Sequence, residues 1–94
     1  MYSQMHNPAH PGMLVREYIG ERSIGAVAKH IGVARATLSR IVNGSSSITA
    51  DMSIRLSEAF GVSPDLLLRM QAQYDLWQES QRTRRKIKPL DHAA

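Results

Sequence analysis

The fold of this chain is decided by residues 24–43, which read IGAVAKHIGVARATLSRIVN. Apolar residues at helical spacing lie on both sides of one glycine, Gly32. They form one shared apolar seam, which consists of Val27, Ile31, Val33, Leu38 and Ile41. Gly32 can adopt the positive φ that a turn of three or four residues requires, and Ala28 is small enough to let two helices approach closely. The segment therefore predicts a helix-turn-helix.

Helix-starting and helix-ending residues recur through the rest of the chain, whereas strand signals are nearly absent. The helices expected from them are a first between Pro11 and Gly20, a second after Ser23, a third over about 35–43, a fourth between Thr49 and Gly61, and a fifth from about Pro64 to Lys86. The expected fold class is therefore all-α: a five-helix orthogonal bundle with a long C-terminal helix. Residues 1–10 would form an arm, residues 11–81 the folded domain and residues 82–94 a basic tail.

The composition of the chain narrows its possible functions. Ninety-four residues suffice for one domain, and the absence of cysteine excludes disulfides and thiolate metal sites. No apolar run approaches the roughly 18 residues of a membrane span, and the first residues do not resemble a signal peptide. We therefore expect a cytoplasmic protein that does not act at a membrane. No arrangement of serine, histidine and acid, or of paired carboxylates, suggests catalysis, so we expect neither an enzyme nor a cofactor.

Two histidines, His6 and His10, are four residues apart, a spacing that can bind a metal ion from one helix face. Pro8 between them opposes a continuous helix, and the sequence offers no obvious third ligand. We therefore expect no metal site, and we expect His10 to help start the first helix.

The net charge of +4 is concentrated at one end of the chain. Residues 1–81 carry seven basic and seven acidic side chains, whereas residues 82–94 carry five basic side chains against Asp91 alone. Two interpretations stay open. The tail is either a solvated helix end, where cations suit the helix dipole, or an arm that reaches phosphate or an acidic partner.

In a helix-turn-helix, the second helix enters the major groove of DNA with its N-terminal residues nearest the bases. The side of this helix opposite the apolar seam carries the candidate base-contacting residues Arg35, Ala36, Thr37, Ser39 and Arg40. Arginine offers a fork that fits guanine, so Arg35 and Arg40 are the first candidates for base reading, although arginine also serves phosphates. Ala36 can meet a thymine methyl group. A helical hairpin without a DNA role would match part of this pattern, and that alternative stays open.

Phosphate contacts are expected from the two ends of the motif. The candidates are Ser23 at the start of the first helix of the pair, Asn43 at the end of the second, and Ser45 and Ser46 in the following loop. Two of them have a purely structural alternative. Ser23 can serve only as a helix cap, and Asn43 only as a helix-ending residue beside Gly44.

Two aromatic residues, Tyr74 and Trp77, share a face of the fifth helix with Leu66 and Met70. Leu66 and Met70 are expected in the core. Aromatic residues near the end of a helix that extends beyond a small bundle favour a dimer contact over a core role. Tyr74 and Trp77 are therefore the candidate dimer interface. A homodimer would place two recognition helices on a palindromic operator in double-stranded DNA.

The run GVARATLSRIVNG at residues 32–44 resembles the helix-turn-helix of lambda-repressor-like proteins. More narrowly, four stretches in order resemble the HigA/VapI-type antitoxins of bacterial toxin–antitoxin systems: HPG at 10–12, ITADMSIRL at 48–56, FGVSPD at 60–65 and QAQYDLW at 71–77. The chain departs from that family at Ala34, where a serine cap is common, and at Ala36, where a glutamine that can reach a base edge is common.

The resemblance implies an antitoxin that represses its own operon. By the same analogy, its partner would be a RelE-like (HigB-type) toxin, a small mRNA-cleaving nuclease. One alternative is a free-standing Cro-like or phage-type repressor that has the same fold and no toxin. Another is a protein-interaction module that keeps the helix-turn-helix scaffold without binding an operator.

Overall fold

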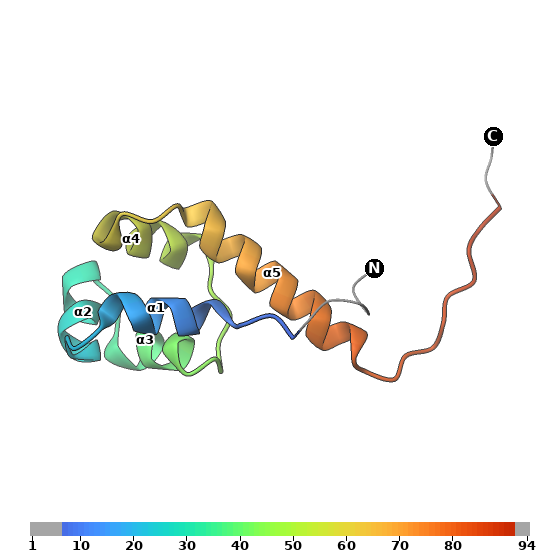
Figure 1. The fold of residues 1–94 in the computed structure, drawn as a ribbon, viewed down its shortest axis with the longest axis horizontal. Helices are drawn as coiled ribbons and strands as arrows, with labels where there is room; N and C mark the ends of the chain where they lie inside the picture. Colours follow the sequence, from blue (N-terminus) through green and yellow to red (C-terminus); the bar gives the residue numbers. More distant parts are fainter. Residues whose placement is uncertain (1–6, 92–94) are drawn as a thin grey trace.

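The computed structural model describes residues 7–91 of the chain. Its helices are α1 (Pro11–Ile19), α2 (Ile24–Ile31), α3 (Arg35–Val42), α4 (Ala50–Phe60) and α5 (Pro64–Ser80). The described residues contain no strand, so the expected five-helix, all-α fold is confirmed. Figure 1 shows α1, α2 and α3 gathered at one side of the molecule, with α4 on the other side and α5 running obliquely from α4 past the end of α1. No described helix has both the length and the apolar character needed to cross a membrane.

The helices begin where short polar side chains satisfy their first backbone amides. Ser23 Oγ accepts a hydrogen bond of 3.0 Å from the amide of Ala26, and Thr49 Oγ1 accepts one of 3.1 Å from Met52. Ala34 precedes α3 and provides no such bond, as expected where the related family often has serine. Ser63, which precedes α5, makes no side-chain cap bond either. The caps therefore explain the boundaries that the sequence predicted, except at the starts of α3 and α5.

The turn between α2 and α3 is built on Gly32, whose φ is 80° as predicted. α4 supports this turn through Arg55, whose Nη1 donates to the last carbonyl of α2, that of Ile31, at 2.6 Å. Arg55 Nε also donates to Asp51 at 2.9 Å, so the guanidinium is held on both sides. A cation at the C-terminal end of a helix is favourable for its dipole. The helix-turn-helix is thus held together by its own apolar seam and is also anchored to α4.

α1 crosses α3 at a very close approach. A Cβ added to Gly12 would overlap the carbonyl oxygen of Ile41 in α3. Only glycine fits at this position, because any side chain would push the two helices apart. Gly12 therefore sets how deeply α3 is seated in the bundle.

One apolar core joins all five helices and contains the predicted seam, with Val33 at its edge. Its buried members are Val15, Ile19, Val27, Ala28, Ile31, Leu38, Ile41, Val42, Ile48, Met52, Leu56 and Leu67. On α5 the expected core residues were wrong by one position. Leu66 and Met70 are only half-buried, whereas Leu67 and Gln71 face the interior. This face of α5 turns inward because Gln71 Oε1 accepts a hydrogen bond of 2.8 Å from the buried amide of Ile48.

The fifth helix ends at Ser80, so the expected end at Lys86 was wrong. The amide of Gln81 closes the helix by donating to the carbonyl of Trp77 at 3.2 Å. Continuing the helix would align Arg82, Arg85 and Lys86 at i, i+3 and i+4, where like charges repel. Every residue from Gln81 to Asp91 is exposed, so no burial compensates for that repulsion. The tail leaves the helix as an irregular segment (Figure 1).

Candidate nucleic-acid interface

The outward side of α3 carries the five predicted base-contacting residues. Arg35, Ala36 and Arg40 are exposed, and Thr37 and Ser39 are half-buried along its edges. The opposite side of the helix is sealed into the core by Leu38 and Ile41. α3 itself contains no acidic residue. The helix therefore presents a small, polar and cationic surface whose backbone is rigidly supported from behind.

Arg35 lies against the start of α2. A Cβ added to Gly25 would lie 3.4 Å from Arg35 Cδ and 3.7 Å from its Nε, so the arginine stem runs over this glycine. The guanidinium is thereby kept near the N-terminal end of α2, where backbone amides give a partial positive charge. Gly25 received no role in the sequence prediction. Its absent side chain leaves the room in which Arg35 is placed.

A polar network closes the C-terminal end of α3. Arg16 Nη2, on α1, donates to the side-chain carbonyl of Asn43 at 3.0 Å, and Asn43 Nδ2 is 3.5 Å from Ser39 Oγ. Arg16, Ser39 and Asn43 thus form one polar group at the surface, assembled from two helices. Arg16 is the residue that sequence reasoning missed. Its signal was the position one turn after Gly12, on the helix that this glycine brings against α3.

The predicted phosphate-contacting serines are already engaged in local structure. Ser23 Oγ caps α2, and Ser45 Oγ donates to the carbonyl of Arg40 at 3.2 Å. The amides of Ser45 and Ser46 also donate to the Arg40 carbonyl, at 2.9 and 3.2 Å. These two amides are therefore turned toward α3. A phosphate contact from Ser45 or Ser46 would have to use a side-chain hydroxyl, and that of Ser45 would first have to leave the Arg40 carbonyl.

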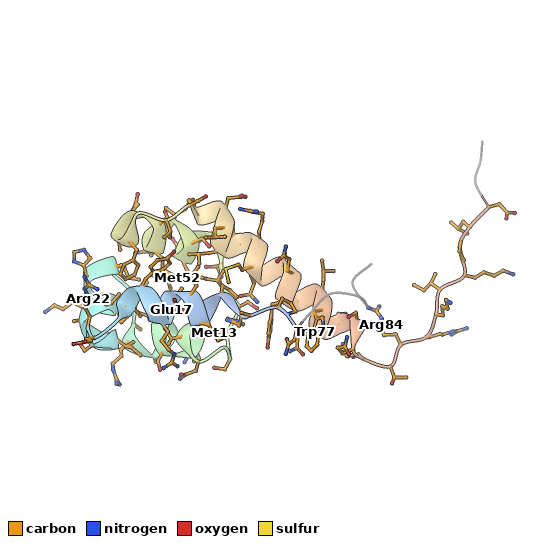
Figure 2. All side chains as sticks on the ribbon, in the orientation of Figure 1. Met13, Glu17, Arg22, Met52, Trp77 and Arg84 are labelled. Atoms are coloured by element: carbon orange, nitrogen blue, oxygen red, sulfur yellow. The ribbon has the colours of Figure 1, made fainter. Side chains whose placement is uncertain are left out.

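The two aromatic residues of α5 have different surroundings. The ring of Tyr74 meets that of His10 edge-on, with centroids 4.9 Å apart, and its hydroxyl accepts from Gln78 at 3.0 Å. Tyr74 is thus partly occupied within its own chain. Trp77 is half-buried and lies near the far end of α5, beyond the main body (Figure 2). Of the predicted pair, Trp77 is the one more available to a second molecule.

The histidine pair does not form a metal site that can be described. His6 lies outside the described residues, and His10 Nδ1 accepts the amide of Gly12 at 2.9 Å as the cap of α1. Within residues 7–91, no three histidine, cysteine, aspartate or glutamate side chains are grouped as metal ligands. The expectation that His10 starts the first helix is confirmed.

Comparisons with known proteins agree with this geometry. Residues 16–67 match a family model described as helix-turn-helix. The chain is 40% identical over 90 residues to virulence-associated protein A′ of Dichelobacter nodosus, across 93% of this chain and 78% of that protein. It is similar to the solved structure of an addiction module antidote protein of the HigA family from Coxiella burnetii, with 32% identity, a TM-score of 0.73, and coverage of 85% and 100% of the two chains. The Pseudomonas aeruginosa antitoxin HigA, solved with the higBA promoter, gives 35% identity, a TM-score of 0.72, and coverage of 77% and 82%.

Proposed function

Because the chain belongs to the helix-turn-helix family, and its structural neighbours are HigA-type antitoxins, we propose that it is a DNA-binding antitoxin that represses its own operon. It would neutralise a cognate RelE-like toxin of the HigB type in the cytoplasm. The observation that carries the DNA-binding part is the exposed, acid-free face of α3 on a fixed support. The similar Pseudomonas aeruginosa antitoxin HigA was solved with the higBA promoter, which supports DNA binding by this chain.

DNA recognition would place α3 in the major groove. Arg35 and Arg40 would reach guanine edges, while Thr37 and Ser39 would act as small hydrogen-bonding groups and Ala36 would allow close approach. The groups at the two ends of the motif would hold the sugar–phosphate backbone. These would be the candidates from the sequence, Ser23, Asn43, Ser45 and Ser46, together with Arg16, which is bonded to Asn43. The phosphate contacts would fix the register in which the base contacts read sequence.

A dimer is needed for tight and specific binding. α3 has eight residues, so one copy reads only a few base pairs. Two copies related by a twofold axis would place their recognition helices about 34 Å apart, which matches half-sites one helical turn apart. Trp77 and Tyr74 are the proposed contact between the copies. The operator would accordingly be palindromic.

The toxin would be met by a folded surface or by an end of the chain. Residues 11–80 consist of helices and short connections, which leave no long loop that could wrap around an enzyme. Neutralisation at a site away from α3 would leave Arg35 and Arg40 available to DNA. Toxin and operator could then bind the same antitoxin molecule.

The test is co-expression with the adjacent reading frame or with the protein that co-purifies from the native host. Growth arrest is expected when that partner is expressed alone, and growth should return when this chain is added. Arg40→Ala should lose repression of a reporter behind its own promoter and keep the rescue of growth. Arg69→Ala is the matched control: it removes an arginine from α5, outside the motif, and should keep both functions.

Two outcomes would contradict the proposal in different parts. A partner that is harmless when expressed alone, with repression intact, would leave a plain repressor of the Cro-like or phage type. Rescue of growth without any binding to the promoter region would instead leave a protein-interaction module.

A further inference from the structure

The folded body of this protein carries no net charge, and its C-terminal tail carries all of it. Residues 1–81 hold seven basic and seven acidic side chains. Residues 82–91 hold five basic side chains against Asp91, and all ten residues are exposed. Attraction of Lys and Arg to phosphates supplies most of the sequence-independent affinity of DNA-binding proteins. A body without net charge supplies this attraction only through the arginines beside α3, and the cations of the tail can add to it.

One carboxylate, that of Glu79, engages the first two arginines of the tail. Arg82 Nη1 lies 2.9 Å from Glu79 Oε2 and 3.2 Å from Oε1, and Arg84 Nη1 lies 3.3 Å from Oε2. The tail bends around this carboxylate, and an open hollow is lined by Glu79 and residues 82–88. Within the described chain, Arg85, Lys86 and Lys88 form no ion pair. Three cations thus face solvent, while two share one acid.

We propose that residues 82–88 form a second DNA-contacting element, which binds backbone phosphates without reading sequence. We further propose that Glu79 competes with DNA for Arg82 and Arg84. A phosphate, like the carboxylate, offers anionic acceptor oxygens, so it can replace Glu79 on the two guanidinium groups. The inference rests on the proposed binding of DNA by α3, and it adds to that surface an electrostatic arm released when DNA is bound.

DNA is favoured over an acidic protein as the partner by the composition of the tail. Protein interfaces are enriched in aromatic residues and arginine and depleted of lysine. Residues 82–91 contain three arginines, two lysines and no aromatic residue, a set of cations without the aromatic side chains that a protein interface uses. The reach is also sufficient, since ten residues in an extended conformation span roughly 30 Å. In Figure 1 the tail leaves the far end of α5, away from α4, and runs outward from the helical body. From there it can follow the backbone of DNA that is held by α3.

The experiment measures how DNA affinity depends on salt for four purified full-length proteins. They are the unmodified chain, a tail variant with Arg85→Gln, Lys86→Gln and Lys88→Gln, the Glu79→Gln variant, and a Glu58→Gln control. Glu58 is an exposed acid on α4, so its replacement changes net charge as Glu79→Gln does and leaves the tail pairs in place. Each protein is titrated with a duplex from upstream of its own gene and with a scrambled duplex, at several salt concentrations.

The tail variant should flatten the log–log salt dependence by about 0.9 for each phosphate that is no longer neutralised, and so by about 2.7 per protomer if all three cations are engaged. The ratio of affinities for the two duplexes should stay unchanged. Glu79→Gln should tighten binding to both duplexes several-fold and steepen the slope, whereas Glu58→Gln should alter neither. Circular dichroism should show equal thermal stability for all four proteins.

An unchanged salt slope in the tail variant would overturn the proposal, as would a Glu79→Gln effect no larger than that of Glu58→Gln. The first result would leave the tail as a solvated end or an arm for an acidic partner, and the second would leave Glu79 without a role in DNA binding. A failure of sequence-specific DNA binding by α3 would give a different result. The unmodified chain would then bind both duplexes equally, while the tail variant still flattened the slope.

Discussion

Arg16 of α1 and Asn43 at the end of α3 are joined by a hydrogen bond of 3.0 Å between the guanidinium and the side-chain carbonyl. The two residues are 27 positions apart in sequence, and they meet because Gly12 lets α1 lie directly on α3. The bond orients Asn43 and leaves the other nitrogens of Arg16 free to donate. A phosphate at this point would meet a cation and an amide held together.

Arg16→Ala should therefore weaken DNA binding uniformly. Removing a hydrogen bond to a charged group costs about 1.5–3 kcal/mol, so the operator and a scrambled duplex should both lose affinity by that amount. The pair is exposed, and the thermal stability of the protein should change little. Titrations of both duplexes at one salt concentration test this. Arg69→Ala serves as control, and a decrease no greater than that of the control would leave the Arg16–Asn43 bond without a role in DNA binding.

Arg35→Ala and Arg40→Ala should each lose about 1–3 kcal/mol of binding free energy on the operator if the arginine reads guanine. Specificity should relax at one base position in each half-site, because the bidentate contact is what rejects the other bases. Affinities for operator and scrambled DNA at fixed salt measure this. Equal decreases on the two duplexes would show that the arginine contacts phosphate. For Arg35 such a result would have a structural explanation, because its side chain lies beside the start of α2.

Gly12→Ala should destabilise the protein because the added methyl group overlaps the carbonyl of Ile41. Overpacking of this kind costs about 1–3 kcal/mol, and relief of the overlap would displace α3 from its seat. Thermal melting and operator affinity should fall together.

Gly25→Ala is the matched substitution. Its Cβ meets only the flexible stem of Arg35, and alanine is favoured over glycine within a helix by about 1 kcal/mol. Stability should be kept or raised, while the position of Arg35 and the affinity for DNA change.

Equal melting temperatures for Gly12→Ala and the unmodified chain would contradict the close approach of α1 and α3.

Trp77→Ala should weaken self-association and operator affinity together, because only a dimer places two copies of α3 on one site. Combining it with Tyr74→Ala should enlarge the effect and also reduce stability, since Tyr74 packs against His10. Tyr74→Phe keeps that ring contact and serves as control. Light scattering at several protein concentrations measures the dimer. A dimer that is unchanged in the double variant would place the interface on another surface.

The sequence by itself determined the features that depend on near neighbours in the chain. Ser23 and Thr49 cap the helices that follow them, and Gly32 takes the left-handed conformation that the turn between α2 and α3 demands. The spacing of apolar residues identified the seam and hence the outward face of α3. Each of these depends on residues within about two helical turns, where helical periodicity and backbone geometry are enough to predict position.

Only the tertiary structure decided which distant residues meet. It placed Arg16 beside Asn43, put Leu67 and Gln71 inside in place of Leu66 and Met70, and ended α5 at Ser80. On α5 several faces are similarly apolar, so periodicity could not choose among them. The choice came from the buried amide of Ile48, which donates to the side-chain oxygen of Gln71, Oε1. The helix end was likewise beyond periodicity: α5 continues past its last buried residue, Gln71, and ends at Ser80, before the cations at 82, 85 and 86 would be aligned on one face.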